Sequence, residues 1–543
     1  MIKSKVVICI QARTNSSRLP GKVLLPVCGL PLSVLAAKRA GYQSSYDTRV
    51  LISEENSDDY LASVLEQHGV LYYRGDLNNV LKRFVDALSA ENDQTIVVRL
   101  TADNVFPDSR FIENIVSYFE SNEFEYVCAN GDSSELPYGL SAEVMRVHHL
   151  RKALVHANDN FDLEHVTPYI RRQYGEHFYK SLNLKNSFSR LRCTVDNLDD
   201  YLKITDIFSS CSDPIGASVE WLCNELLDKF PIKKSTNKLV LGTAQLGLAY
   251  GINNKTGKPD SHSASNLLST AARLGVYYID TARTYGDSEK VIGSWLQKGW
   301  QGRCKVITKL GTLEELNERS STRLVSAAVE ASLSQSCLSL GLNRIDVLML
   351  HRTEHLYQFD GAVLKKLNIF KSIGVITNLG VSVQSPQELF IALQHKDVDF
   401  IQLPYNLFDH RWSEAITKIR EEKKHRKITI HVRSVLLQGL LVSDCPKLWA
   451  RANVDFDTSK QAVTWLTNQT KKYGYSSIYE LCISYVNSLD WVDGIVVGCE
   501  NLHQIKSNIE AINLECSNRE YPLRNLTPPF SLSENTLNPA LWK

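Results

Sequence analysis

The sequence of 543 residues lacks the features by which membrane, secreted and nucleic-acid-binding proteins are usually recognised. Lysine and arginine number 61 against 60 for aspartate and glutamate, so no excess charge attracts the chain to nucleic acid or to an anionic membrane. No stretch of about 18 apolar residues is present, and no small-residue cleavage site follows the apolar start. The 12 cysteines never form a CxxC pair. We therefore predict a cytoplasmic protein with reduced thiols and with no nucleic-acid or membrane partner.

The length of the chain predicts two domains, because a single hydrophobic core stops growing at about 250–300 residues. Residues 231–237 are polar and without periodicity, and a fresh alternation of strand and helix patterns begins after them. We place a linker there, between a first domain at 1–230 and a second at 238–543. The sequence leaves the oligomeric state open, with a homodimer as one candidate.

In the first domain, short apolar runs alternate with longer helical patterns such as the one over 77–88. This alternation predicts an open, mostly parallel α/β sheet. The runs expected to form its strands are Lys5–Ile10, Arg49–Ile52, Thr95–Leu100, Tyr126–Ala129 and Arg192–Val195.

The second domain contains eight apolar runs with helical patterns between them. Eight strand-helix units are the number that closes a (β/α)8 TIM barrel. The runs are Leu239–Gln245, Tyr277–Thr281, Lys305–Lys309, Ile345–His351, Asn378–Val383, Phe400–Tyr405, Ile428–Ser434 and Gly494–Cys499.

Four ionisable residues follow or end three successive strands of this barrel, where the loops of the active face converge. They are Asp280, Tyr285, Lys309 and His351. Such a set suits carbonyl reduction, in which a hydride reaches carbon while the oxygen gains a proton. Free phenols hold their proton up to about pH 10, so a tyrosine acid needs an ammonium group nearby.

These roles predict Tyr285 as proton donor, with Lys309 oriented by Asp280, and His351 as a hydrogen-bond donor to the carbonyl oxygen. Each residue taken singly also fits a structural role, as an ion pair or as packing at the barrel mouth. The order of all four on successive strand ends favours catalysis.

Several segments of the second domain resemble the aldo/keto reductase family. They are Leu241-Gly-Thr-Ala-Gln-Leu-Gly247, Asp280-Thr-Ala-x-x-Tyr-Gly286, Gly380-Val-Ser382, Gln402-Leu-Pro-Tyr-Asn406 and Gln438-Gly-Leu-Leu441. The resemblance implies an NAD or NADP cofactor whose nicotinamide is held by Ser382 and Gln402. It places the rest of the cofactor near Arg433, Ser434, Gly498, Glu500, Gln504 and Asn508.

Two differences from the family pattern concern the cofactor. The chain reads Ser382-Val383 where the family often has Ser-Asn, and Arg433-Ser434 where a tyrosine often stacks on the nicotinamide. Glu500 stands where the family often has an arginine for the 2′-phosphate of NADPH. Because a carboxylate repels that phosphate, Glu500 predicts a preference for NADH. The alternative role of Glu500, as a cap of the following helix, is compatible with this repulsion.

The first domain opens with a strand that runs into a basic loop. Arg13, Arg18 and Lys22 lie within ten residues and could clamp a triphosphate, although a solvated basic loop would look the same. The spacing is not that of a P-loop, since GxxxxGK[ST] is absent.

The whole string around this loop resembles cytidylyltransferases that activate sialic-acid-like and 3-deoxy sugar acids, including members named for spore-coat polysaccharide synthesis. Further matching segments are Arg74-Gly-Asp76, Val98-Arg-Leu-Thr-Ala-Asp103-Asn104, Glu164-His-Val-Thr-Pro168 and Leu191-Arg-Cys-Thr-Val-Asp196. The resemblance implies a nucleotide-diphospho-sugar transferase-like sheet, CTP and a sugar acid as substrates, and Arg74 and Asp103 among the nucleotide-binding residues.

Transfer of a nucleotidyl group requires Mg²⁺ to neutralise the phosphates, and Asp103 and Asp196 at two strand ends are the candidate ligands. Either aspartate could instead cap a helix. The chain therefore predicts a bifunctional enzyme of surface-glycan or sugar-acid biosynthesis. A glycosyltransferase or a non-catalytic sugar-nucleotide module remains the alternative for the first domain, although the Asp-x-Asp pair usual in glycosyltransferases is absent at Thr101–Asn104.

Overall fold

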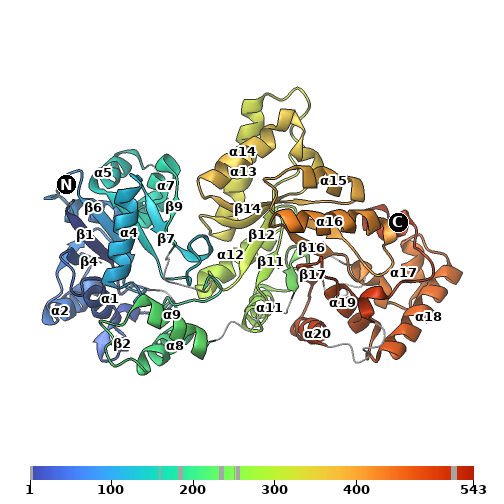
Figure 1. Cartoon of the computed structure of the whole chain (residues 1–543), viewed down its shortest axis with the longest axis horizontal. Helices are drawn as coiled ribbons and strands as arrows, with labels where there is room; N and C mark the ends of the chain where they lie inside the picture. Colours follow the sequence, from blue (N-terminus) through green and yellow to red (C-terminus); the bar gives the residue numbers. More distant parts are fainter. Residues whose placement is uncertain are drawn as a thin grey trace. The chain divides into compact units, whose positions relative to one another are not determined.

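The computed structural model describes residues 4–16, 18–157, 160–180, 188–230, 238–249, 251, 257–514 and 522–542. The chain divides into two compact units, an N-terminal unit whose continuous part ends at residue 233 and a C-terminal unit made mostly of residues 234–543 (Figure 1). The expected linker, 231–237, lies outside the described residues.

The N-terminal unit is built on a seven-stranded sheet in the order β5-β4-β1-β6-β8-β7-β9. The strands are β1 (Val6–Gln11), β4 (Asp47–Ser53), β5 (Tyr72–Gly75), β6 (Ile96–Thr101), β7 (Val127–Ala129), β8 (Ala142–Arg146) and β9 (His177–Phe178). The first four strands of the order run parallel, whereas β8 is antiparallel to both of its neighbours. The expected mostly parallel α/β sheet is confirmed.

Helices cover both faces of this sheet, so an inner strand such as β1 is apolar on both sides. Ile8 and Ile10 of β1 pack with α1 (Leu32–Ala40), α2 (Asp59–Gln67), α4 (Ser109–Ser121), α8 (Leu198–Ser209) and α9 (Val219–Lys229). Val7 and Cys9 of the same strand point to the other face, with α3 (Val80–Ala87), α5 (Val147–His156) and α7 (Pro168–Tyr174). Because alternate side chains of a strand point to opposite faces, β1 contributes to two hydrophobic cores, one on each face of the sheet.

One expected strand of this unit is wrong. Residues 192–195 do not form a strand and touch their neighbours through isolated bridges, Thr194 with Asn104 and Arg192 with Tyr138. Gly139 explains the close approach, because a Cβ atom there would lie 2.6 Å from the backbone nitrogen of Thr194. The apolar run in the sequence indicates that this segment is buried, but it does not show that the segment forms hydrogen bonds along a neighbouring strand.

The C-terminal unit is a closed barrel of eight parallel strands, in chain order from β10 to β17. They are β10 (Leu239–Gly242), β11 (Tyr278–Asp280), β12 (Lys305–Lys309), β13 (Ile345–Leu350), β14 (Ile376–Ser382), β15 (Phe400–Pro404), β16 (Thr429–Arg433) and β17 (Gly494–Gly498). Each coincides with one of the eight expected runs, so the predicted TIM barrel is confirmed.

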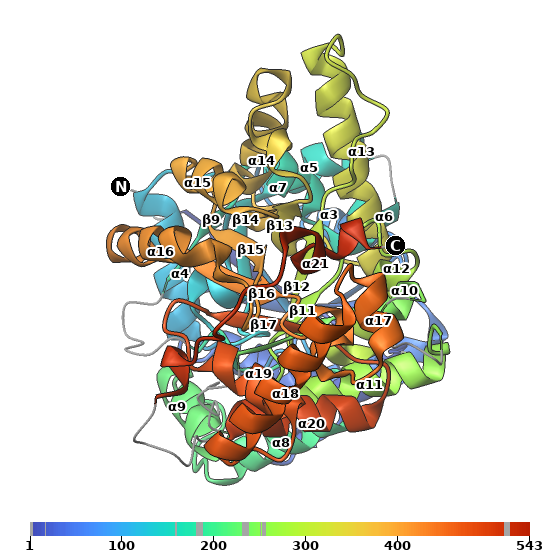
Figure 2. The ribbon, with the colours of Figure 1, turned by 90° about the vertical axis from the view of Figure 1, so that its right-hand side faces the viewer.

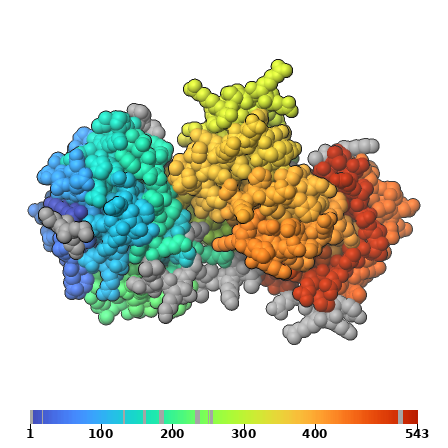
Figure 3. All heavy atoms as spheres, turned by 45° about the horizontal axis from the view of Figure 1, so that its top comes forward, coloured from blue at the N-terminus to red at the C-terminus, as the bar shows by residue number. Residues whose placement is uncertain are grey.

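The helices of this unit surround the strands, as Figure 2 shows. Many of these helices begin with an Asp, Ser or Asn residue, whose side chain accepts a hydrogen bond from the first turn as an N-cap. Asp260 caps α11 (Ser261–Arg273), Ser321 caps α13 (Thr322–Leu340), Ser385 caps α15 (Pro386–Gln394), Asp455 caps α18 (Phe456–Tyr473), Ser477 caps α19 (Ile478–Asn487) and Asn501 caps α20 (Leu502–Asn513). The first turns of α13 and the loop before them stand out from the surface of the unit (yellow-green in Figures 2 and 3).

The strands place polar side chains at one end of the barrel because side chains two residues apart point to the same face. An apolar layer that includes Ile307, Met349 and Phe400 fills the interior. Lys309 lies two residues beyond Ile307, and Gln402 lies two residues beyond Phe400. The active end of the barrel therefore begins directly above its packed floor.

The C-terminal segment closes over part of this end. It contains α21 (Glu534–Leu537), which lies in front of the strands in Figure 2. Phe530 packs on Phe408 with ring centroids 5.4 Å apart, and Arg411 pairs with Glu534 at 3.3 Å. Within the described residues, no helix has the length and apolarity needed to cross a membrane.

Candidate active sites in the two units

The barrel mouth is organised around an ion pair between Lys309, the last residue of β12, and Asp280, the last residue of β11. Lys309 Nζ lies 2.9 Å from both carboxylate oxygens of Asp280 and donates to the carbonyl oxygen of Thr281 at 3.0 Å. Gln402 Nε2 donates to Asp280 Oδ1 at 2.8 Å. The carboxylate is therefore fixed by two neighbouring side chains, and the ammonium by three acceptor atoms.

Tyr285 and His351 complete this cluster. The ammonium of Lys309 lies 5.1 Å from the centroid of the Tyr285 ring, a cation–π distance. The Tyr285 and His351 rings meet edge to face with centroids 6.4 Å apart. Thr284 Oγ1 lies 3.4 Å from His351 Nδ1. The four expected catalytic residues are thus brought together.

The charges of the cluster follow from burial and from its ion pair. Burial alone lowers the pKa of Lys309, but the Asp280 carboxylate outweighs this effect and the pKa is raised overall. Lys309 is therefore an ammonium at neutral pH. Burial, with Lys309 and Arg433 nearby, lowers the pKa of His351 to about 4. His351 is neutral at pH 7 and can donate one N–H without adding a charge to the site.

A cavity of about 660 Å³ opens above the cluster. Every residue expected to be catalytic or cofactor-binding in this unit lines it: Asp280, Tyr285, Lys309, His351, Ser382, Gln402, Arg433, Ser434, Gly498, Glu500, Gln504 and Asn508. This volume lies within the range of about 300–1,000 Å³ that is usual for small-molecule and cofactor pockets. Gln402 Oε1 is buried without a hydrogen-bond partner among the described residues, which leaves one acceptor for a ligand amide.

The loop after β17 holds its residues by local hydrogen bonds. Asn501 is the N-cap of α20, so the alternative role of Glu500 as that cap is wrong. The backbone N–H of Glu500 donates to Gln504 Oε1 at 2.7 Å, and Asn508 Nδ2 donates to Cys499 Sγ at 2.9 Å. Glu500 is half-buried at the cavity wall.

Other residues of the wall were missed in the sequence. They include Gln245, Gln384, Gln438, Tyr479, Glu480, His503, Ser507 and Glu510. Gln245 and Gln438 belong to segments that resemble the reductase family and could have been found there. Tyr479 and Glu480 lie on α19, whose sequence gives no sign that its start reaches the cavity.

The second site lies in the N-terminal unit, where Lys22 joins two aspartates. Lys22 Nζ lies 2.6 Å from Asp103 Oδ2 and 3.0 Å from Asp196 Oδ1, and it donates to the carbonyl oxygen of Val195 at 2.9 Å. Asp103 follows β6, and Asp196 directly precedes the Asn197 cap of α8. Lys22 begins a 3-10 turn (Lys22–Leu24) after Gly21, which is left-handed with φ 69°.

Arginines tie Asp196 further into this cluster. Arg18 Nη2 lies 2.6 Å from Asp196 Oδ1, and Arg192 pairs with Asp196 and with Asp200. Burial on its own raises the pKa of Asp196, but Lys22 and Arg192 outweigh it and hold the pKa below its usual range. Burial lowers the pKa of Lys22, and Asp103 reverses the effect so that it is raised. Lys22 and Asp196 are therefore both charged at neutral pH.

Two expected nucleotide-binding residues bond elsewhere. Arg13 makes an exposed ion pair of 3.4 Å with Glu164. Arg74 pairs with Asp59 at 2.7 Å and donates to the carbonyl oxygens of Ser53 and Glu55. Arg192 and Asp200 were not expected in the cluster, although Arg192 stands in a segment that resembles the cytidylyltransferases.

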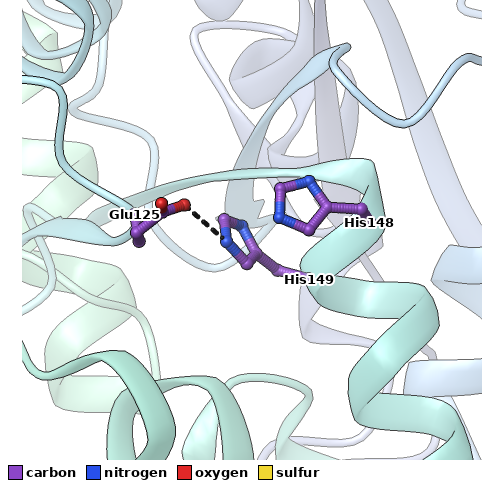
Figure 4. Close-up of side chains that lie close together, drawn as sticks. All are labelled: Glu125, His148 and His149. Atoms are coloured by element: carbon purple, nitrogen blue, oxygen red, sulfur yellow. Dashed lines mark hydrogen bonds and ion pairs between the residues drawn. The ribbon is translucent and has the colours of Figure 1, made fainter.

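A separate cluster of Glu125, His148 and His149 has the spacing of a metal site but a different function (Figure 4). His149 Nδ1 accepts a hydrogen bond from the backbone N–H of Arg146 at 3.1 Å, so the proton of the neutral ring is on Nε2. Nε2 faces Glu125 at 2.9 Å. A ring nitrogen that carries a proton cannot bind a metal, and His149 instead caps α5.

Comparison with known proteins assigns a family to each unit. The model of the aldo/keto reductase family matches residues 238–523, and the cytidylyltransferase model matches residues 7–209. The N-terminal part is 28% identical over 236 residues to spore coat polysaccharide biosynthesis protein SpsF of Bacillus subtilis, over 42% of this chain and 95% of that protein.

Two further relatives carry more specific names. An 8-amino-3,8-dideoxy-manno-octulosonate cytidylyltransferase of Shewanella frigidimarina is 32% identical over 129 residues, 23% of this chain and 51% of that protein. A D-threo-aldose 1-dehydrogenase of a Pseudomonas species is 28% identical over 235 residues, 38% of this chain and 70% of that protein. The chain is thus an enzyme that belongs to the aldo/keto reductase family through its barrel, with a cytidylyltransferase domain at its N-terminus.

Proposed function

We propose that the barrel is an NAD(P)-dependent oxidoreductase that interconverts a carbonyl and an alcohol on a sugar-like substrate. The observation that supports this most is the buried Asp280–Lys309 pair beneath Tyr285, with neutral His351 beside it. Tyr285 gives its proton to the carbonyl oxygen, Lys309 stabilises the phenolate that remains, and His351 donates a hydrogen bond to the same oxygen. In the reverse direction Tyr285 takes the proton back.

The cofactor residues are proposed on the same wall of the cavity. Ser382 and Gln402 would hold the nicotinamide, since Gln402 Oε1 offers a free acceptor to a carboxamide N–H. Arg433 and Ser434 would lie beside the ring, and Gly498, Glu500, Gln504 and Asn508 near the adenosine end. The cofactor supplies the hydride that the chain itself lacks. The aldose 1-dehydrogenase among the relatives supports a sugar as substrate and oxidation as one direction.

For the N-terminal unit we propose Mg²⁺-dependent transfer of a cytidylyl group to a sugar acid. A sugar hydroxyl oxygen gives its proton to water and bonds to the α-phosphorus of CTP, the bond from that phosphorus to the bridging oxygen breaks, and pyrophosphate leaves with the electron pair of that bond. Arg18 and Lys22 would bind the phosphates. Asp103 and Asp196 are the oxygen ligands suited to Mg²⁺, which would neutralise phosphate charge.

The two remaining arginines have different places in this proposal. Arg13 is about half exposed and its ion pair is long, so it can turn to a bound phosphate. Arg74 is held by Asp59 and two carbonyl oxygens, and we assign it to the support of the nucleotide loop. The relatives named for octulosonate activation and for spore-coat polysaccharide support a sugar acid and a role in surface-glycan synthesis.

One experiment tests both halves on the full chain. Pyrophosphate release is measured with CTP, Mg²⁺ and a panel of sugar acids, and cofactor reduction or oxidation with a panel of sugars. Asp103→Asn should abolish pyrophosphate release and leave the redox reaction unchanged. If the wild type releases no pyrophosphate with any nucleotide and acid, the N-terminal unit is a glycosyltransferase or a binding module. Activity with ready-made nucleotide sugars would identify the former.

A further inference from the structure

Lys22 occupies the space between the two aspartates proposed as metal ligands. Its Nζ atom is within 3.0 Å of an oxygen of Asp103 and of Asp196, and it also donates to the carbonyl oxygen of Val195. The Lys22 side chain is 9% exposed, so these acceptors enclose the ammonium. In the free protein a cation therefore already bridges the two carboxylates.

A divalent ion and this ammonium cannot occupy the same pair of carboxylate oxygens, Asp103 Oδ2 and Asp196 Oδ1, together. Mg²⁺ requires oxygen ligands at about 2.0–2.1 Å. An ion at that distance from both bridged oxygens would lie next to Nζ, where the two positive charges repel each other with little screening. The cluster is also electrically balanced. Three cations, Lys22, Arg18 and Arg192, face three carboxylates, Asp103, Asp196 and Asp200.

We propose that Lys22 is an exchangeable counter-cation that keeps a divalent metal out of this site until a nucleoside triphosphate binds. The inference rests on the proposed nucleotidyl transfer. The polyphosphate offers Lys22 and Arg18 new anionic oxygens, and the carboxylates they release then accept the metal. Nucleotide and metal are therefore linked, and each raises the affinity for the other by the same factor.

The surroundings of Lys22 fit such an exchange. The side chains of Arg18 and Asp103 are 29% and 24% exposed, so the cluster opens to solvent on their side. Arg192 is 5% exposed and stays paired with Asp196 and Asp200, which holds Asp196 in place when Lys22 leaves. A lysine suits this role better than an arginine, because its compact ammonium sits on a flexible stem and is not tied to a bidentate geometry.

The test uses Mn²⁺ as a probe and equilibrium dialysis of the full chain. Without nucleotide, Lys22→Gln should bind Mn²⁺ at least tenfold more tightly than the wild type, because a neutral amide replaces the ammonium. With CTP present, the wild type should retain one Mn²⁺ for each nucleotide bound. Mn²⁺–CTP formed in free solution is measured without protein and subtracted. Lys82→Gln removes a lysine that pairs with Asp86 on the surface of the same unit, and it should behave as the wild type.

Equally tight Mn²⁺ binding by the wild type with and without CTP would overturn the inference, as would no gain in Lys22→Gln. The wild-type comparison decides alone if that variant fails to fold. A different outcome marks failure of the proposed function. In that case no nucleotide binds the wild type under any condition, while Lys22→Gln still gains affinity for Mn²⁺.

Discussion

Lys309 Nζ lies 2.9 Å from each carboxylate oxygen of Asp280, and the two side chains are only 1% and 4% exposed. A buried ion pair of this kind gives little net stability, but the loss of one partner leaves an uncompensated charge in the interior. Asp280→Asn should therefore lower the free energy of unfolding of the barrel by about 3–5 kcal/mol.

Chemical denaturation followed by tryptophan fluorescence measures this loss, because all tryptophans except Trp221 belong to the C-terminal unit. The double variant Asp280→Asn/Lys309→Met removes both charges and should recover part of the stability. An equal loss in the single and double variants would show that the pair is not the cause.

Tyr285→Phe tests whether Tyr285 acts in proton transfer and not in binding of the nicotinamide cofactor. The phenyl ring keeps the contact with the Lys309 ammonium and with His351, while the acidic proton is lost. We expect kcat to fall by about 10²–10⁴, with the Kd of the nicotinamide cofactor unchanged. The Kd comes from fluorescence quenching and kcat from the absorbance of the reduced cofactor. A variant with wild-type kcat would remove Tyr285 from the role of acid. Tyr357→Phe, an exposed tyrosine of the same unit, is the control.

The barrel could be predicted almost completely because each of its strands is a short, buried apolar run and helical patterns separate these runs. The same rule placed Asp280, Lys309 and His351 at one mouth, since parallel strands end on one side. It failed at 192–195, where a run is buried without ladder partners. The sequence also could not predict which polar side chains bond to one another. Nothing in the order of residues indicates that Gln402 binds Asp280, or that Arg192 reaches both Asp196 and Asp200.

The N-terminal site shows a second limit of sequence reasoning. Basic and acidic residues in a binding motif can be assigned to a ligand, but in the free protein they also bind one another. Lys22 was expected to hold phosphate and Asp103 to hold metal, and they lie 2.6 Å apart. Arg74 was expected in the same group and is bound to Asp59 instead. Such pairings depend on loop geometry that residue types alone do not specify.

Glu500 should set the preference between nicotinamide cofactors. The carboxylate lies at the cavity wall and is not used as a helix cap, so it is available to repel a 2′-phosphate or to accept hydrogen bonds from the free ribose hydroxyls. We expect the wild type to bind NADH at least as tightly as NADPH. Glu500→Arg should tighten NADPH binding by about tenfold, or about 1.4 kcal/mol.

Titration of both cofactors by fluorescence quenching checks this preference. The control, Glu414→Arg, makes the same change of charge on the exposed start of α16 (Ser413–His425) and should leave both affinities unchanged. NADPH bound tenfold more tightly than NADH by the wild type, with no change in Glu500→Arg, would contradict the role of Glu500.

His431 should make the barrel sensitive to acid. Its ring is 1% exposed among Tyr278, Phe400 and Gly494, and neither ring nitrogen has a hydrogen-bond partner among the described residues. Burial, together with the charges of Lys309 and Lys423, lowers the pKa of His431 to about 3. Burial and these two positive charges all oppose protonation of the ring.

The sign of the effect follows from proton linkage. Between about pH 6.5 and about pH 3 the unfolded chain binds a proton at this position and the folded chain does not. The contribution of the neutral His431 ring to the free energy of unfolding is fully present above pH 6.5. It is lost as the pH falls towards 3, at up to about 1.4 kcal/mol for each pH unit. His351, with a pKa of about 4, adds to the same trend.

His431→Leu removes the titrating ring and should make the free energy of unfolding of the barrel fall less steeply between pH 6.5 and pH 4. At pH 7 the variant should be close to the wild type in stability, since an unpaired polar ring is exchanged for an apolar side chain of similar size. Urea denaturation at several pH values, followed by tryptophan fluorescence, gives the slopes. His425→Leu, at the exposed end of α16, is the matched control and should keep the wild-type slope. Parallel pH profiles for His431→Leu and the wild type would contradict this prediction. They would show that the acid sensitivity of the barrel comes from groups other than His431.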